Sequence, residues 1–292
     1  MSLLSEPECV WALGAELGEG PLWQARENAL WFVDIKKKRI HRFAHAGGVQ
    51  QSFNAPEQPG FLAPLPDGKF IAGLKTGLHT FDPLSGSLTF RRAVEPDQPG
   101  NRLNDGAVDS KGQLWFGSMD DGENARTGRL YRLGARGVQA MDEGYCITNG
   151  PAFSPDGKTL YHTDTLKGII YAFDLHDDGS LSNKRIFVEI ENALGYPDGP
   201  VVDDEGFLWT GLFGGWSVRR YSPQGELSKT VKFPCANVTK IAFGGPKLTT
   251  VYATTAAKGL DAIARQAQPL AGGLFQFETD TPGPPQHEVL YG

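Results

Sequence analysis

Three oxygen-bearing side chains stand directly before a Gly-Pro pair in widely separated parts of the chain. They are Glu19, Asn149 and Asp198, and an apolar stretch follows each pair. Two carboxylates and one amide carbonyl form an all-oxygen ligand set, which suits a divalent cation completed by water or substrate. Chemistry of this kind requires that three residues far apart in the sequence meet in the folded protein.

Each residue alone has a simpler explanation, because Asx-Gly and Glu-Gly pairs are common turn formers. The set is harder to explain in this way, since a turn would accept Ser or Gly equally well. Asn104 adds a fourth oxygen donor, because it precedes Asp109 by the same number of residues as Asp198 precedes Asp203. Arg102 nearby either balances the acidic charge or holds a polar substrate, and spacing alone does not decide between the two.

The elements that could bring these residues together follow from a repeat along the chain. Six apolar stretches typical of strands recur, with the aromatic residues Trp31, Phe70, Trp115, Tyr161, Trp209 and Tyr252 as markers. The step between neighbouring markers ranges from 39 residues (Trp31 to Phe70) to 48 residues (Tyr161 to Trp209). Propeller blades have this period, roughly 40 to 50 residues.

Tight turns and further strands recur at similar distances around each marker, which gives four strands per blade. The sequence therefore predicts an all-β fold, a six-bladed β-propeller with four-stranded blades around a central channel, as a single domain over residues 1–292. The first strand of each blade lines the channel, so Glu19, Asn104, Asn149 and Asp198 should face one shared space. Residues 10–13 and 287–291 are the two candidates for the strand that closes the ring, and residues 256–269 form either a short helix or an irregular insertion.

Composition limits the classes of partner. The formal net charge of −6 provides no basic patch for a phosphate backbone, so nucleic acid is not expected. The first residues lack a basic start followed by an apolar segment, and no apolar run reaches membrane-spanning length, which predicts a cytoplasmic protein without a membrane partner. Cys9, Cys146 and Cys235 lack metal-ligand spacing and are expected to be reduced packing residues, and His41 and His162 are expected to be structural.

Four motifs together resemble the regucalcin/gluconolactonase (senescence marker protein) family of six-bladed propellers, and the resemblance covers nearly the whole chain. They are residues 17–21 (LGEGP), 101–106 (NRLNDG), 148–151 (TNGP) and 196–199 (YPDG). Within the family, residues 31–35 (WFVDI), 161–165 (YHTDT) and 237–240 (NVTK) look like the bacterial xylonolactonase and arabinonolactonase branch.

The resemblance implies a role for each site residue. Glu19, Asn149 and Asp198 match the metal ligands, which would hold one divalent cation, Ca²⁺, Fe²⁺, Zn²⁺ or Mn²⁺. Arg102 and Asn104 match residues that contact the sugar. Asp121 matches a further sugar contact, although the adjacent Asp120 competes for that place.

The expected activity is metal-dependent hydrolysis of a sugar-acid lactone, such as D-xylonolactone or L-arabinonolactone, to the aldonic acid. Asp198 would also take a proton from the attacking water, and the sequence has no Gly-x-Ser-x-Gly nucleophile motif. Three alternatives stay open: a gluconolactonase with hexonolactone preference, a non-catalytic calcium-binding propeller, and a phosphotriesterase-like hydrolase. A neutral polyol pocket around Arg102 argues against the last of these. The expected partner is a small sugar lactone, and the protein is expected to be a monomer.

Overall fold

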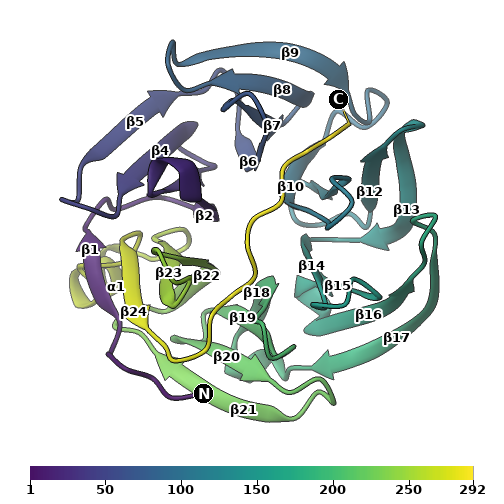
Figure 1. Ribbon diagram of the computed structural model, residues 1–292. Coiled ribbons are helices and arrows are strands. Elements are labelled where there is room, and N and C mark those ends of the chain that lie inside the picture. Colours follow the sequence, from purple (N-terminus) through teal and green to yellow (C-terminus); the bar gives the residue numbers. More distant parts are fainter. Residues whose placement is uncertain (292) are drawn as a thin grey trace.

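Six four-stranded antiparallel sheets form a ring, as predicted, in a computed structural model that describes residues 1–291 (Figure 1). Blade one comprises β2 (Gly18–Gln24), β3 (Ala29–Asp34), β4 (Arg39–Ala44) and β5 (Gln50–Asn54); blade two comprises β6 (Pro59–Pro64), β7 (Phe70–Leu74), β8 (Gly77–Asp82) and β9 (Ser87–Ala93); blade three comprises β10 (Asn101–Val108), β11 (Leu114–Asp120), β12 (Gly128–Gly134) and β13 (Gly137–Tyr145). Blade four comprises β14 (Thr148–Phe153), β15 (Thr159–Asp164), β16 (Ile169–Leu175) and β17 (Leu181–Glu189); blade five comprises β18 (Tyr196–Val202), β19 (Leu208–Phe213), β20 (Ser217–Tyr221) and β21 (Leu227–Lys232); blade six comprises β22 (Asn237–Gly244), β23 (Thr250–Ala256), β24 (Leu274–Glu278) and β1 (Glu8–Trp11).

The ring is closed by the N-terminal strand. β1 pairs antiparallel with β24, so residues from both ends of the chain build blade six. Residues 287–291, the other candidate, do not form a strand, because β1 already occupies the outer edge of β24. The C-terminal segment instead crosses the ring (Figure 1), where the N–H groups of Val289 and Leu290 donate to the carbonyl oxygens of Pro64 and Gly112.

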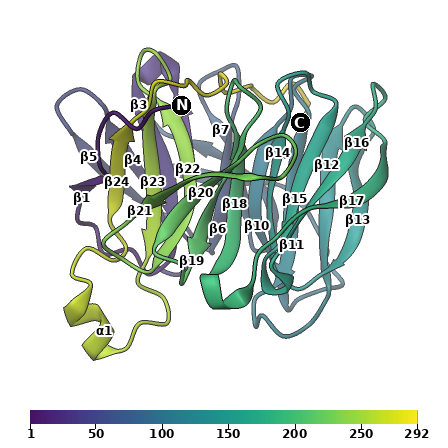
Figure 2. The same cartoon turned by 90° about the horizontal axis from the view of Figure 1, so that it is seen from below.

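The helical content is small. Residues 256–269, left open between helix and loop, contain the helix α1 (Ala262–Ala267), and Asp261 caps it by accepting from the N–H of Ala264. Three single-turn 3-10 helices are η1 (Ala25–Glu27), η2 (Thr165–Lys167) and η3 (Asn192–Leu194). Figure 2 shows α1 at one end of the ring and both chain ends at the other. We call the end with α1, which is drawn at the bottom of Figure 2, the upper face. The end with the C-terminal segment, drawn at the top of Figure 2, is the lower face.

The marker aromatic residues form the packing between blades. Trp31, Trp115, Trp209 and Tyr252 are fully buried. The indole Nε1 of Trp115 donates to Asp109 at 2.8 Å, and that of Trp209 donates to Asp203 at 2.8 Å, so the two turn aspartates satisfy buried donors. These bonds fix the height of the innermost strand against the second strand in blades three and five.

The innermost strand of every blade has a local register shift against its neighbour, where one or two residues have no cross-strand partner. The shifts lie between Glu19 and Leu22, Pro59 and Phe61, Leu103 and Gly106, Asn149 and Ala152, Pro197 and Pro200, and Val238 and Ile241. Bulges of this kind redirect side chains, and proline is tolerated because the innermost strand has an edge that needs no N–H donor. The repeated Gly-Pro pairs therefore turn the preceding oxygen-bearing residues toward the channel.

Candidate metal and substrate site

The three predicted metal ligands lie buried on the innermost strands near the upper face. Glu19 is 5 % exposed, Asn149 2 % and Asp198 5 %. Glu19 belongs to β2, Asn149 to β14 and Asp198 to β18, so blades one, four and five each supply one side chain.

The two carboxylates affect one another electrostatically. Burial, followed by the charge of Asp105, raises the pKa of Glu19 to about 7. Burial and then the charge of Glu19 raise the pKa of Asp198 well above its usual range. Among the described residues Asp198 Oδ1 has no hydrogen-bond donor, and a buried acceptor without a donor is costly. Within the described part of the chain, Glu19 accepts only from the Gly20 N–H, through Oε2 at 3.0 Å. Two buried carboxylates with so few protein donors fit a bound divalent cation, which would neutralise both.

Asn104 joins the ligands to the predicted substrate residues. Its Nδ2 donates to Asn149 Oδ1 at 3.0 Å and to the Thr148 carbonyl at 2.6 Å, while its Oδ1 accepts from Arg102 Nη1 at 2.6 Å. Asn149 Nδ2 in turn donates to Thr165 Oγ1 at 2.9 Å, which leaves its Oδ1 directed toward Asn104. The amide of Asn104 is thus held in one orientation between a metal-ligand candidate and Arg102.

Arg102 is buried and partly committed to protein partners. Its Nε donates to Asp121 Oδ1 at 3.0 Å and its Nη1 donates to Asn104 and to the Leu103 carbonyl, whereas Nη2 has no hydrogen bond to any described residue. Partial burial works to raise the pKa of Asp121, but the hydrogen bond from Lys36 and the charge of Arg102 outweigh it, so this pKa lies below its usual value. The structure places Asp121, and not Asp120, beside Arg102, because Asp120 accepts from the N–H groups of Asn124 and Ala125 in its own loop.

A buried ion pair between Asp105 and Lys240 was not predicted from the sequence. Lys240 Nζ donates to both carboxylate oxygens at 2.6 and 2.8 Å, and Asp105 Oδ2 also accepts from the Gly150 N–H at 2.8 Å. These two residues occupy the unpaired bulge positions of blades three and six, where blades one, four and five have glycine. The sequence offered one signal for this ion pair, because a charged residue stands at a position where the other blades named here have glycine.

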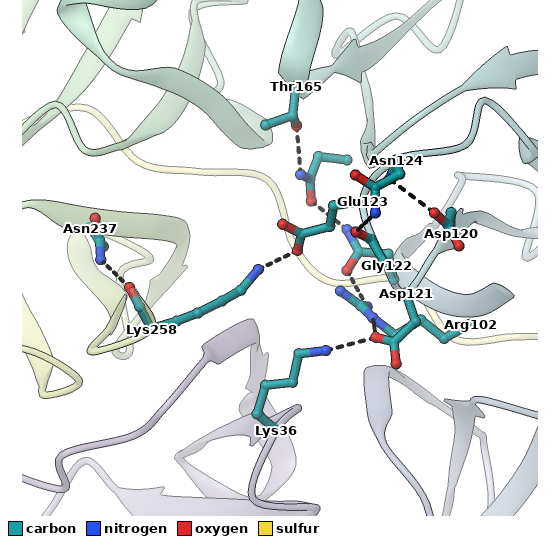
Figure 3. Close-up of polar contacts among 12 residues, drawn as sticks. Lys36, Arg102, Asp120, Asp121, Gly122, Glu123, Asn124, Thr165, Asn237 and Lys258 are labelled. Carbon is teal, nitrogen blue, oxygen red and sulfur yellow. Dashed lines mark hydrogen bonds and ion pairs between the residues drawn. The ribbon is translucent and has the colours of Figure 1, made fainter. Parts of the chain in front are cut away.

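The upper rim of the site is more basic than a neutral polyol pocket would be. Figure 3 shows Lys36 and Lys258 approaching from two sides toward Asp121 and Glu123 in the loop after β11. Lys36 Nζ lies 2.7 Å from Asp121 Oδ1, Lys258 Nζ pairs with Glu123, and Lys75 Nζ lies 3.9 Å from Asp121 Oδ2. Sequence reasoning missed these lysines because they lie in turns between strands or in an insertion, outside the repeating strand positions.

The C-terminal segment crosses the lower end of the channel (Figure 1). A cavity of about 180 Å³ below the site is lined by innermost-strand residues such as Pro151, Pro200 and Lys240 and by residues 284–287 of the C-terminal segment. His41 and His162 make their contacts elsewhere: His41 Nδ1 pairs with Ser52 Oγ, and the His162 ring packs edge-on against Tyr145. Both are buried, as expected for structural residues.

Two features are absent from the described part of the chain. Within residues 1–291, no cluster of three or more His, Cys, Asp and Glu side chains is arranged to hold a metal ion, and the proposed ligand set combines two carboxylates with one amide. No helix in that range is long and apolar enough to cross a bilayer.

Comparison with known proteins agrees with the geometry. The 6-deoxy-6-sulfogluconolactonase of Pseudomonas putida is 33% identical over 279 residues, covering 94% of this chain and 96% of the relative. The L-arabinolactonase of Azospirillum brasilense is 35% identical over 268 residues, covering 90% and 88%. The crystal structure of a calcium-binding protein, regucalcin, from Agrobacterium tumefaciens superimposes with a TM-score of 0.94 at 28% identity, covering 98% and 97%.

Residues 17–257 match the family described as SMP-30/Gluconolactonase/LRE-like region. This match covers most of the ring, including every predicted ligand and substrate residue. The chain therefore belongs to the SMP-30/gluconolactonase/LRE-like family.

Proposed function

We propose that the protein hydrolyses a sugar-acid lactone with the help of one divalent cation held by Glu19, Asn149 and Asp198. The observation that carries this proposal is the buried, donor-free Asp198 Oδ1 at the channel mouth, next to the charge of Glu19. Lactonase names among the relatives support the same class of reaction.

The proposed reaction assigns separate roles to the bound cation, to Asp198 and to the pair Asn104 and Arg102. When bound, the cation would polarise the lactone carbonyl as a Lewis acid. Asp198 accepts the proton of the attacking water at a carboxylate oxygen, a role that contributes about 10²- to 10⁴-fold. Asn104 and Arg102 orient the sugar hydroxyls, and the buried setting of the ligands keeps bulk water away from them.

For the substrate we propose a pentonolactone such as D-xylonolactone or L-arabinonolactone, an assignment favoured by the similarity to the A. brasilense L-arabinolactonase. The second candidate is a hexonolactone, and the observation in its favour is the similarity to the P. putida enzyme, which is named for a sulfonated hexonolactone. The third is calcium binding without turnover, for which the A. tumefaciens regucalcin structure is the reason.

A panel of pentono- and hexonolactones tests these candidates, with protein stripped by chelator and then supplied singly with calcium, iron, zinc or manganese. Metal-restored turnover that is lost in Asp198→Asn supports the proposal, and Asp67→Asn serves as control because Asp67 is an exposed turn residue. Tight calcium binding with no turnover on any lactone would instead favour the binding protein. Full activity of Asp198→Asn would remove its role as proton acceptor.

A further inference from the structure

The upper rim carries a cluster of four cations from four different blades. Lys36, Lys75, Arg102 and Lys258 belong to blades one, two, three and six, and we call them the rim cluster. Three of them converge on one carboxylate: Asp121 Oδ1 lies 2.7 Å from Lys36 Nζ and 3.0 Å from Arg102 Nε, and its Oδ2 lies 3.9 Å from Lys75 Nζ. The fourth, Lys258, pairs with Glu123.

Positive charge exceeds negative charge in this cluster. Asp121 and Glu123 provide two negative charges against four positive charges. The cluster stands out because the protein as a whole has a formal net charge of −6.

The nearby carboxylates on the upper face are engaged elsewhere. Asp120 accepts from backbone N–H groups of its own loop, and Glu57 accepts from the N–H and hydroxyl of Thr76. Glu16 pairs with Arg265 at 3.0 Å. These three carboxylates therefore do not balance the surplus positive charge. Glu19 acts on Arg102 and Asp198 acts on Lys258, but both belong to the proposed metal ligands, whose charge a bound divalent cation would neutralise.

The cluster also has unused donors. Lys75 Nζ forms no hydrogen bond with any described residue, and the same is true of Arg102 Nη2. Lys36 and Lys258 each use one of three ammonium donors on a carboxylate. One cation would be enough to pair with Asp121 if this carboxylate had only a structural role. Three cations around one carboxylate repel one another, and a second anion bound between them would reduce that repulsion.

A chain of hydrogen bonds links the metal-ligand candidates to this cluster. It runs from Asn149 through Asn104 and Arg102 to Asp121, with steps of 3.0, 2.6 and 3.0 Å. Figure 3 shows its last step, from Arg102 to Asp121. A lactone whose carbonyl lies at the ligands and whose hydroxyls follow Asn104 and Arg102 would bring its far end to the rim cluster. That end would meet Lys36, Lys75 and Lys258.

We propose that the preferred substrate is an anionic sugar lactone, bearing a phosphate, sulfonate or carboxylate at the end remote from the lactone carbonyl, and that Lys75, Lys36 and Lys258 bind this group. This inference rests on the proposed lactonase function and gives it a substrate class. Ammonium groups with free donors suit any of these three anions.

The test compares hexonolactones that are identical except at the terminal carbon, where one has a hydroxyl and the others a phosphate, a sulfonate or a carboxylate. Wild-type kcat/KM should be higher for at least one anionic member than for the hydroxyl compound. It should fall with rising salt for that anionic member alone, since salt screens exposed charges. The variant Lys75→Gln should lose about tenfold in kcat/KM on the anionic lactone, mostly through KM, and stay within about twofold on the neutral lactone.

Lys69→Gln is a matched control, because Lys69 flanks the same strand β7 at its other end and is 42% exposed in its side chain against 38% for Lys75. It should leave both substrates unaffected. Lys36→Gln should repeat the selectivity of Lys75→Gln.

The outcomes separate this inference from the proposed function. Turnover of neutral lactones with no gain for any anionic member, or equal losses on both substrates in Lys75→Gln, would overturn the inference while the lactonase assignment stands. No turnover of any lactone, with every metal supplied, would overturn both.

Discussion

The buried pair of Asp105 and Lys240 allows a quantitative test of how the charge around the ligands is balanced. Their side chains are 2% and 7% exposed and meet at 2.6 Å. Lys240→Met keeps most of the stem volume but leaves the Asp105 carboxylate buried without its cation, beside Glu19 and Asp198. Removing one partner of a buried pair costs about 3–5 kcal/mol of unfolding free energy.

The double variant Asp105→Asn/Lys240→Met should recover most of that loss, because the buried carboxylate of Asp105 and its cation are then removed together. The amide oxygen introduced by Asp105→Asn can still accept from the Gly150 N–H, which Asp105 Oδ2 accepts at 2.8 Å in the native protein. We therefore expect a coupling free energy of about 2 kcal/mol or more between the two positions, within the range measured for residues in contact.

The assay is denaturant unfolding of the wild type, both single variants and the double variant, at pH 7.5 with chelator present so that bound metal does not contribute. The exposed pair Lys111 and Asp177, at 2.9 Å, serves as the control cycle and should show no measurable coupling. Lys240→Met with wild-type stability, or a buried cycle as small as the control, would show that Lys240 does not neutralise Asp105 and would refute the reasoning.

Three further predictions concern single side chains. Glu19→Gln should weaken metal binding by at least tenfold in a titration, because one formal charge leaves the ligand set; unchanged affinity would exclude Glu19 as a ligand. Arg102→Lys should keep metal content but lower kcat/KM on the best lactone by about tenfold, since Lys cannot bridge Asp121 and Asn104 with a planar fork; loss of metal would make Arg102 a counter-ion to the ligands instead. Burial lowers the pKa of His162 from 6.5 to about 3. Below pH 6.5 the unfolded chain therefore binds a proton that the folded chain does not. This group should lower the free energy of unfolding by about 2 kcal/mol when the pH falls from 7 to 5. His162→Phe should lose that part of the pH dependence in unfolding curves at the two pH values, and an unaltered dependence would mean that the buried ring is not held neutral.

The fold was predictable because its determinants are local and repeated. The marker aromatic residues recur once in each blade, and the Gly-Pro pairs recur in blades one, four and five. Strand order, the number of blades and the shared height of Glu19, Asn149 and Asp198 therefore follow from counting along the chain. The ring closure was predicted only in part. Prolines 282, 284 and 285 remove donors just before the C-terminal candidate, and β1 takes the edge that this candidate would need.

The electrostatics of the site were less predictable. Asp105 and Lys240 are 135 residues apart, and their contact depends on how blades three and six face one another across the channel. Lys36, Lys75 and Lys258 lie outside the strands, in segments of different length, and no repeat fixes where such segments end in space. The positive charge at the rim therefore could be recognised only from the structure, whereas the positions of the acidic ligands could be aligned from the sequence.

The pairing of β1 with β24 has a consequence for how the chain folds. Glu8 is made early in synthesis, yet its register partner Gln276 emerges near the end, so the final blade assembles last and through a contact of very high sequence separation. Such contacts slow folding, because the entropy of a long loop is lost before the contact stabilises anything. Until β1 docks, the outer edge of β24 offers unpaired N–H and carbonyl groups to a neighbouring chain, which is a known route to aggregation. Shortening the N-terminus into Glu8–Trp11 should therefore lower the yield of soluble protein even though the proposed ligands lie on other strands.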